Sequence, residues 1–456
     1  MAIRPARRTR RSSRRAGAAL ALALGIVASV FAARCTFDGL DQYASGSNDG
    51  GPDGVAEGST DGAPLDVSPA CSACTDAETC VQGKCETCSA TWSVPYAAVG
   101  ANGHYYQPST STLYVSGSRQ IGDAAATGYF AFVDSCTGTL ERALDPPTIG
   151  DAAVGSLGQS APSGSTLFIG AGVPQPPNAG GYATFNFKSQ SFASLFGVPK
   201  FSSPPHTDEI WEIATANGHL WMSGTTLTDS PPQSPVIVKS NGAGSACAAV
   251  LPYSGMSGRA IAATAADVYL AIAGNDIQVL HFGESSCPTT SPCSCAPSWT
   301  SQPFTLTNNM NTMGAHRSTI VGSTLYVVGW AIKQGSTTDW EGYVAQLDLA
   351  SKAWGPTYTY DPTAAIDAFV NVATDGAHLY VSGESGWDGV NYATASSAVV
   401  VLPIPLVANS TATIIDVPPL RVAWSIDLDA TGMVLTGASS GTDSRSVRCT
   451  RTSCPP

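Results

Sequence analysis

The stretch LYVSG, at residues 113–117 and again at 379–383, decides the fold because related stretches recur along the chain. Each is a short run of aliphatic, aromatic or β-branched residues ending in glycine, which is typical of a β-strand before a turn. The others are LFIG (167–170), LWMSG (220–224), VYLAIAG (268–274), LYVVG (325–329) and MVLTG (433–437). They repeat every 53 residues or so, roughly the length of one four-stranded propeller blade.

Other parts of each repeat support the same fold. A second apolar run follows the first in several repeats, as in GYFAFVD (128–134), GYATFNF (181–187) and GYVAQLD (342–348). Asn217-Gly218 precedes one of the first runs and favours a tight two-residue hairpin. The chain holds 46 glycines and 31 prolines, which suits many short strands and turns rather than helices. We therefore predict an all-β chain with a seven-bladed β-propeller over residues 89–456.

The two ends of this domain complement each other. The last repeat has a third strand at RSVRCTR (445–451), after which too few residues remain for a fourth. A spare strand, TWSVPYAAV (91–99), lies at the start of the domain. We predict that this N-terminal strand completes the seventh blade and closes the ring, leaving no open sheet edge.

The first 34 residues are typical of an export signal. A basic segment rich in arginine precedes an uninterrupted apolar stretch at 16–33. FAARC (31–35) resembles the lipobox of bacterial lipoproteins, in which case Cys35 carries the lipid. Cleavage after Ala32 with simple secretion, or an uncleaved anchor of residues 1–34, are the alternatives.

Two short regions are predicted between the signal and the propeller. Residues 35–70 are acidic and rich in glycine and serine, which predicts a disordered linker. Residues 71–88 form a cysteine-rich module, for which disulfides are favoured over zinc in an exported chain. One of its thiols is expected to bridge to the C-terminal end of the propeller. The disulfide candidates are Cys71, Cys74, Cys80, Cys85, Cys88, Cys449 and Cys454.

Charge excludes one class of partner. The whole chain has 22 basic and 34 acidic residues, and eight of the arginines lie in the first 34 positions. The remainder is strongly acidic and should repel nucleic acid and anionic lipid. Any membrane association is then expected only through the lipid anchor.

Two groups of residues are candidates for ligand binding. Long loops between second and third strands carry tryptophans flanked by carboxylates, which suits a carbohydrate or cationic ligand. The alternative is that these tryptophans pack between blades. This first group is Trp330, Asp339, Trp340, Glu384, Trp387 and Asp388.

The second group lies nine residues before the recurring strand, where the innermost strand of each blade is expected. Trp211, Arg259, His316 and Trp424 occupy this position in four repeats, and Arg317 follows His316. They are predicted to line the mouth of the central channel, where the basic side chains would attract an anion. A merely solvated rim is the alternative. No catalytic motif, metal site or cofactor is predicted.

The repeats resemble those of bacterial exported seven-bladed β-propeller repeat proteins. The match is best in ATDGAHLYVSG (373–383) and EGYVAQLDLASKAW (341–354). This resemblance implies an exported, lipid-anchored or secreted protein of the outer membrane or cell surface, without an assigned activity. We expect a monomeric, non-enzymatic protein that binds a protein or carbohydrate. An enzyme on the same scaffold, such as a glycoside hydrolase or lyase, and a structural envelope protein are the alternatives.

Overall fold

The computed structural model describes most of the chain from Glu78 onward, all within the unit Phe37–Pro456. The predicted signal segment, Cys35 and the linker lie outside the described residues. No helix in the described part is both long and apolar enough to cross a bilayer. The described ranges are 78–81, 84–88, 90–97, 99–120, 126–146, 148–149, 152–153, 156–172, 181–197, 207–227, 233–243, 246–288, 294–306, 310–388, 394–429, 431–440 and 443–455.

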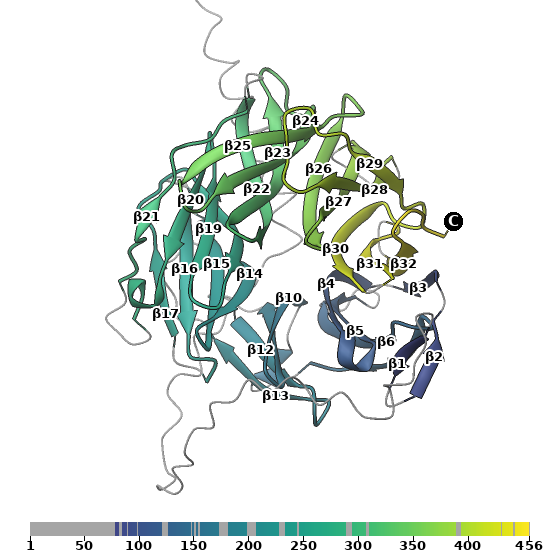
Figure 1. Ribbon diagram of the computed structural model, residues 1–456. Helices are drawn as coiled ribbons and strands as arrows, with labels where there is room; N and C mark the ends of the chain where they lie inside the picture. The colour runs from purple at the N-terminus through teal and green to yellow at the C-terminus, as the bar shows by residue number, and fades with distance from the viewer. Residues whose placement is uncertain are drawn as a thin grey trace, which may run out of the picture. The chain divides into compact units, whose positions relative to one another are not determined.

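The described chain is all-β, apart from the single-turn 3₁₀ helices η2 (Pro108–Thr110) and η3 (Glu284–Ser286). The strands form antiparallel four-stranded sheets, arranged around a common centre (Figure 1). This confirms the predicted β-propeller. Sheet by sheet, the strands are β4 (Val99–Gln107), β5 (Thr112–Arg119), β6 (Thr127–Asp134) and β7 (Thr139–Leu144); β10 (Ser156–Ser163), β11 (Thr166–Gly172), β12 (Gly181–Asn186) and β13 (Ser191–Gly197); β14 (Thr207–Ala216), β15 (His219–Leu227), β16 (Ser234–Ser240) and β17 (Ala246–Val250); β18 (Ser257–Ala263), β19 (Val268–Ala273), β20 (Ile277–Phe282) and β21 (Trp299–Thr300); β22 (Met310–Val321), β23 (Thr324–Lys333), β24 (Trp340–Asp348) and β25 (Ala353–Tyr360); β26 (Ile366–Thr374), β27 (His378–Trp387), β28 (Ser396–Pro403) and β29 (Thr413–Asp416); and β30 (Val422–Leu428), β31 (Gly432–Ala438), β32 (Ser444–Thr450) and β3 (Trp92–Tyr96).

Three short hairpin or bridging elements complete the sheets. β1 (Glu78–Val81) pairs with β2 (Lys84–Thr87), and β8 (Thr148–Ile149) pairs with β9 (Ala152–Ala153). A single parallel residue pair between β24 and β26, Trp340 with Ile366, joins two neighbouring blades into one eight-stranded sheet.

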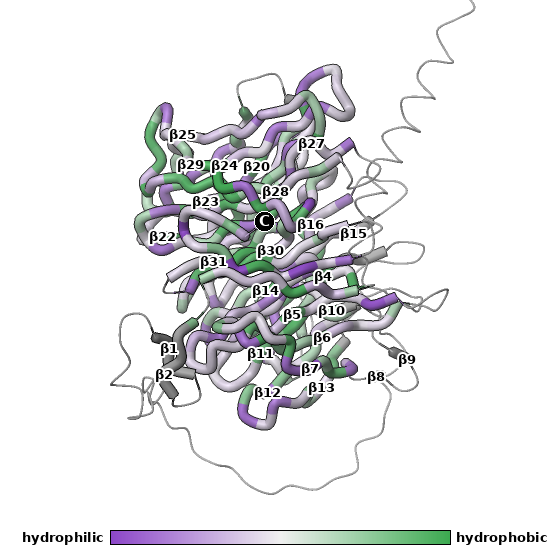
Figure 2. The backbone as a smooth tube through the Cα atoms, turned by 90° about the vertical axis from the view of Figure 1, so that its right-hand side faces the viewer, coloured by the Kyte–Doolittle hydropathy of each residue, from purple (hydrophilic) through white to green (hydrophobic). Residues whose placement is uncertain are grey.

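The first strand of each blade is the innermost. These strands are β4, β10, β14, β18, β22, β26 and β30; each contacts the next, and β30 contacts β4. Apolar residues are concentrated along the strands and polar residues at many of the turns (Figure 2). The core is therefore divided among the interfaces between sheets.

An apolar cluster lies between each sheet and the next. Between the second and third blades, for example, Tyr182 packs with Ile210 and Met222. The last blade and the first share such a cluster as well, in which Val434 of β31 packs with Val115 of β5. Burial of this kind favours the folded state by about 25 cal/mol per Å² of apolar surface.

The glycine that ends four of the recurring motifs, Gly117, Gly329, Gly383 and Gly437, has a steric cause. Gly329 ends LYVVG, and a Cβ atom there would collide with the carbonyl oxygen of Gly314 on the inner strand β22. Gly437 ends MVLTG and faces the carbonyl oxygen of Val422 on β30 in the same way. The inner strand is pressed against its neighbour at this point, so only glycine fits.

The N-terminal strand pairs with the last strand of the chain. β3 lies antiparallel to β32, with Trp92 opposite Arg448 and Tyr96 opposite Ser444. The Trp92 indole Nε1 donates a hydrogen bond to the carbonyl oxygen of Ser135 at 2.8 Å, in the turn between β6 and β7. Trp92 therefore connects the last blade to the first.

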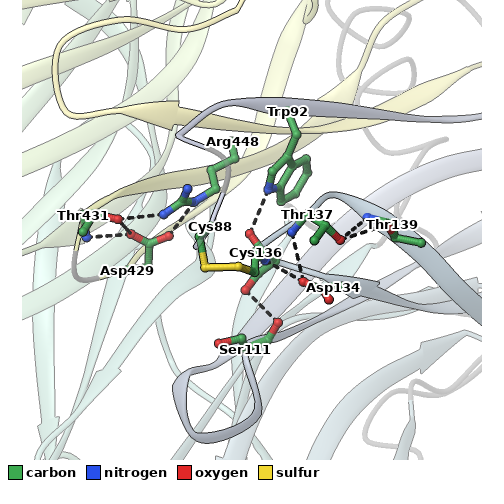
Figure 3. The surroundings of a disulfide bond; sticks show 11 residues. Cys88, Trp92, Ser111, Asp134, Cys136, Thr137, Thr139, Asp429, Thr431 and Arg448 are labelled. Carbon is green, nitrogen blue, oxygen red and sulfur yellow. Dashed lines mark hydrogen bonds and ion pairs between the residues drawn. A yellow bond between two sulfur atoms is a disulfide. The ribbon is translucent and has the colours of Figure 1, made fainter. Parts of the chain in front are cut away.

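The predicted disulfide from the cysteine-rich module to Cys449 or Cys454 is wrong. Cys88 bonds to Cys136 in the first blade, and Cys449 bonds to Cys454 (Figure 3). Cys136 lies in the turn that Trp92 contacts. The segment just before β3, which carries Cys88, therefore lies next to Cys136. The last strand turns back on itself after Cys449, and the nearest thiol is then Cys454.

Further disulfides tie loops within the blades. Cys287 bonds to Cys295, and Cys247 is also disulfide-bonded. Disulfides are typical of proteins that fold in an oxidising compartment.

Candidate functional site

A β-bulge recurs in the innermost strand of every blade. In each sheet the register of the inner strand shifts against its neighbour and leaves an extra residue, and β22 and β26 have a second shift near their starts. Four of the motif glycines, Gly117, Gly329, Gly383 and Gly437, lie opposite these bulges. The residues in the bulges are Asn102, Gly158 with Gln159, Trp211, Arg259, His316, Val370 and Trp424.

Four of these bulge residues are the ones that the sequence singled out. Trp211, Arg259, His316 and Trp424 are each half-buried. All four belong to the innermost strands of their blades. The four residues occupy equivalent bulges in their blades, while their predicted place at the mouth of a channel stays a prediction.

Trp211 and Arg259 form one contact pair. The guanidinium carbon of Arg259 lies 3.7 Å from the centroid of the Trp211 ring, which is a cation–π geometry. The two residues come from neighbouring blades, so the pair crosses the interface between β14 and β18. The stacking fixes the direction of the indole and the guanidinium together.

His316 is held as a neutral hydrogen-bond acceptor. The indole Nε1 of Trp330 donates to His316 Nε2 at 2.9 Å. Burial lowers the pKa of His316 to about 3, and the positive charges of Arg259 and Arg317 act in the same direction. His316 therefore carries no charge at physiological pH.

Arg317 forms the principal ion pair of this region. Its Nη1 lies 2.8 Å from Oε1 of Glu212, and the two side chains are 17% and 5% exposed. The other oxygen of Glu212 accepts a hydrogen bond from the backbone N–H of Ile261 at 3.0 Å. Glu212 thus links three blades. Burial raises its pKa to about 7, although the charge of Arg317 opposes the rise.

Asp427 on β30 faces the same space. Its Oδ2 accepts a hydrogen bond from the Tyr106 backbone N–H at 3.0 Å, and 38% of its side chain is exposed. Loss of hydration around the carboxyl group raises the pKa of Asp427 above its usual range. The hydrogen bond from the Tyr106 backbone and the charge of Arg317 act in the opposite direction. We call Trp211, Glu212, Arg259, His316, Arg317, Trp424 and Asp427 the axial site.

A chain of polar contacts runs from Asp427 through His104 into the last blade, although the buried Nε2 of His104 makes no hydrogen bond with any described residue. His104 Nε2 lies 3.5 Å from Asp427 Oδ2, and His104 Nδ1 lies 2.8 Å from the Thr436 hydroxyl. Thr436 is 2.7 Å from Ser446, and the Tyr96 hydroxyl donates to Ser446 at 2.9 Å. Burial and the Arg317 charge lower the pKa of His104 to about 3, so this histidine is neutral. The chain connects the axial site to the N-terminal strand β3.

The structure corrects the predicted aromatic platform. Trp340, Trp387 and Glu384 are only 2%, 4% and 2% exposed, so they do not present an open surface to a ligand. Trp340 stacks on Trp330 with ring centroids 4.4 Å apart, as expected if tryptophans pack within and between blades. Burial explains the miss, because a sequence does not show which loop aromatics fold inward.

The two acidic loop residues of this group lie nearer the surface. Asp339 is 30% exposed on its side chain and pairs with Lys333 at 2.8 Å, while Asp388 is exposed. Lys333 also contacts Asp361 at 2.7 Å, so its charge is already matched by two carboxylates.

Glu384 belongs to a buried acidic pair rather than to a ligand surface. Its Oε2 is buried without a hydrogen-bond partner, and burial together with the nearby charge of Asp367 raises the pKa of Glu384 to about 8. Asp367 is fully buried and accepts hydrogen bonds from the backbone N–H groups of Thr363 and Gly386. Among the described residues, no group of three or more histidine, cysteine or carboxylate side chains is placed to hold a metal ion.

Sequence reasoning missed Glu212, His104 and Asp427. Glu212 follows Trp211 directly, as Arg317 follows His316. The sequence could therefore have identified Glu212 by its position next to a bulge residue. His104 and Asp427 gave no such signal, because only the ring brings the first and last blades together.

No family model and no curated protein matches the chain. Solved structures similar to it include the WD40 β-propeller domain of Doa1, with 9% identity, a TM-score of 0.43, and coverage of 78% of this chain and 95% of that one. BamB from Moraxella catarrhalis shares 10% identity, with a TM-score of 0.38 and coverage of 78% and 98%. Drosophila Semaphorin 2a shares 8% identity, with a TM-score of 0.47 and coverage of 79% and 75%. At this distance these likenesses assign neither a ligand nor an activity.

Proposed function

We propose that the chain is an exported, closed seven-bladed β-propeller that binds a carbohydrate or protein at the cell surface through the axial site, without catalysis. It is anchored by a lipid on Cys35 or secreted, as in the bacterial propeller repeat proteins that its sequence resembles. The disulfides support export, because thiols stay reduced in the cytosol.

Three features support the closed ring of seven blades. β3 completes the last sheet, β30 contacts β4, and an apolar cluster lies between the last sheet and the first. A ring closed in this way leaves no open edge at the seam for pairing with another chain. This favours a monomer.

The observation that carries the binding proposal is the composition of the axial site. Two half-exposed indoles, Trp211 and Trp424, lie on inner strands together with the guanidinium of Arg259. The exposed part of an indole offers a flat apolar surface, which suits the C–H groups of a sugar, and the Arg259 guanidinium stacked on Trp211 offers N–H donors for its hydroxyl groups. The glycan class is therefore favoured over a protein partner.

A glycan array with the purified full chain tests this function. We expect binding to a subset of glycans, with an affinity at least about tenfold lower for Trp211→Ala and Trp424→Ala, as for buried aromatic anchors in other interfaces. Trp354→Ala is the matched control, because Trp354 lies on β25, a fourth strand, and should leave binding unchanged. Equal binding by all variants, or no binding to any glycan, would contradict the proposal.

A glycoside-cleaving enzyme is the second candidate, favoured by one observation. Glu212 and Asp427 both lie within reach of the Arg317 charge, and the raised pKa of Glu212 suits the protonated acid of a glycosidase carboxylate pair. Against it, Glu212 is 4% exposed and both of its oxygens are already engaged. Release of reducing ends from a polysaccharide, abolished by Asp427→Asn, would establish the enzyme instead.

A further inference from the structure

Arg317 is the most central cation of the axial site. Its charge acts on Glu212 from β14, on Asp427 from β30 and on His104 from β4, which belong to three different blades. The ion pair with Glu212 shows how far this side chain extends, because it joins β22 to β14 across the intervening blade of β18. With 17% of its side chain exposed, Arg317 also remains in contact with solvent.

Glu212 is the internal partner of this cation. One oxygen lies 2.8 Å from Arg317 Nη1, and the other is fixed by the Ile261 backbone N–H. The carboxylate therefore occupies the position that an external carboxylate would take on the guanidinium. Burial gives Glu212 a pKa of about 7, so its negative charge is lost as the pH falls through that value.

The other charged and titratable groups around the pair are few. His316 and His104 are neutral, since burial lowers the pKa of both. Arg259 adds a second positive charge from β18 and also lowers the pKa of Glu212. Asp427 is the second carboxylate, and its raised pKa means that it loses charge on acidification as well. When Glu212 is protonated, the axial site therefore carries net positive charge within an otherwise acidic protein.

We propose that the axial site binds the carboxylate of an acidic sugar through Arg317, with Glu212 as an internal competitor that makes binding tighter at acidic pH. The inference rests on the proposed glycan-binding function and names its ligand class. A guanidinium and a carboxylate match in a planar two-bond geometry. The half-buried indole of Trp211, which directly precedes Glu212 on β14, supplies an apolar surface for the sugar ring.

Isothermal titration calorimetry with the purified full chain tests the proposal. The probe is trigalacturonate, and the matched neutral probe is the same oligosaccharide with its carboxylates reduced to alcohols. We expect trigalacturonate to bind up to about thirtyfold more tightly at pH 5.5 than at pH 8.5, the most that one competing group with a pKa of about 7 contributes over this range. The reduced probe should bind weakly at both values.

Variants of the ion pair separate the two residues' roles. Glu212→Gln should bind trigalacturonate tightly at both pH values, whereas Arg317→Gln should lose the preference for the acidic over the reduced probe. Arg142→Gln removes one arginine on β7, away from the inner strands, and should change neither. Should the ion-pair variants fail to fold, the parent chain itself is informative: it should take up a proton on binding trigalacturonate near pH 7.

Some outcomes would overturn this inference and leave the proposed function standing. Equal binding of both probes, lost in Trp424→Ala, would show a sugar site that does not recognise a carboxylate. Displacement of trigalacturonate by inorganic phosphate at equal concentration would show a general anion site. Binding of neither probe while the glycan array gives a neutral ligand would also end the proposal.

Discussion

Glu384 shows how a single buried acid couples this protein to pH. The carboxyl group is 2% exposed on β27, and burial with the nearby Asp367 raises its pKa to about 8. Because the folded state holds this proton more tightly than the unfolded chain, stability is full at low pH. It is lost as the pH rises from the unfolded pKa through about 8.

Glu384→Gln should remove this loss. At pH 9 we expect the variant to be more stable than the parent by about 2 to 4 kcal/mol, since each pKa unit corresponds to about 1.4 kcal/mol. At pH 4 the two should be equal. Urea unfolding at both pH values measures the difference, with Asp388→Asn, an exposed change nearby, as the control. A variant that is less stable than the parent at pH 9 would contradict the buried, protonated state.

Gly329 tests the steric cause of the repeat. A Cβ atom at this position would collide with the carbonyl oxygen of Gly314 and approach the Tyr343 hydroxyl at 2.8 Å. Gly329→Ala should therefore lower the free energy of unfolding by about 1 to 3 kcal/mol, the usual cost of overpacking. Gly100→Ala is the control, because a Cβ there meets the Ser118 hydroxyl at an ordinary 3.4 Å. Equal stability of both variants would refute the explanation.

At the residue scale the sequence singled out five of the seven residues of the proposed axial site. The constant spacing of the repeat identified equivalent positions in four blades, and each position is a bulge of an inner strand. These residues are Trp211, Arg259, His316 and Trp424. The pairing of Arg317 with Glu212 could not be predicted. It depends on how far two side chains reach across an intervening blade, which the period does not encode.

At the scale of elements, the segment around β3 joins the start of the domain to both the last blade and the first. β3 hydrogen-bonds to β32, Trp92 bonds to the turn after β6, and Cys88 bonds to Cys136 in that turn. A small pocket lies beside this disulfide (Figure 3), lined in part by the buried ion pair Arg448–Asp429, whose side chains are 4% and 7% exposed.

The two disulfides near this seam should contribute unequally to stability. Cys88 and Cys136 are 48 residues apart, whereas Cys449 and Cys454 are 5 apart. In the chain-entropy model the longer loop contributes about 4 kcal/mol and the shorter about 2. Unfolding by urea of Cys88→Ser/Cys136→Ser and of Cys449→Ser/Cys454→Ser should show this order. The reverse order would mean that β3 docks independently of its disulfide.

Element-level prediction succeeded where turn chemistry is local. Asn217-Gly218 was predicted as a tight hairpin, and both residues have positive φ, at 51° and 70°, as such a turn requires. Disulfide pairing was predicted wrongly, because it depends on which thiols the folded seam brings together. Cys88 is bonded to Cys136 in the first blade, whereas β3, which follows Cys88 in the sequence, pairs with β32 in the last blade.

At the scale of the whole molecule, the period of the apolar runs was enough to predict a β-propeller. Each repeat buries its apolar faces only against its neighbours, so a regular spacing implies a regular stack of sheets. The binding platform was not predictable in the same way. The burial of Trp340 and Trp387 depends on the residue pair that joins β24 to β26. This contact between blades leaves no mark in the repeated sequence.

The closed ring is the claim on which the axial site depends, because only closure brings Asp427 and His104 of the last and first blades together. Hydrogen exchange of the backbone amides in β32, resolved residue by residue in the full chain, tests it most directly. We expect every amide of residues 445–449 to be protected, since β31 covers one edge of β32 and β3 covers the other. Exchange of every second amide at the rate of an unprotected chain would show an uncovered edge and contradict the closed propeller.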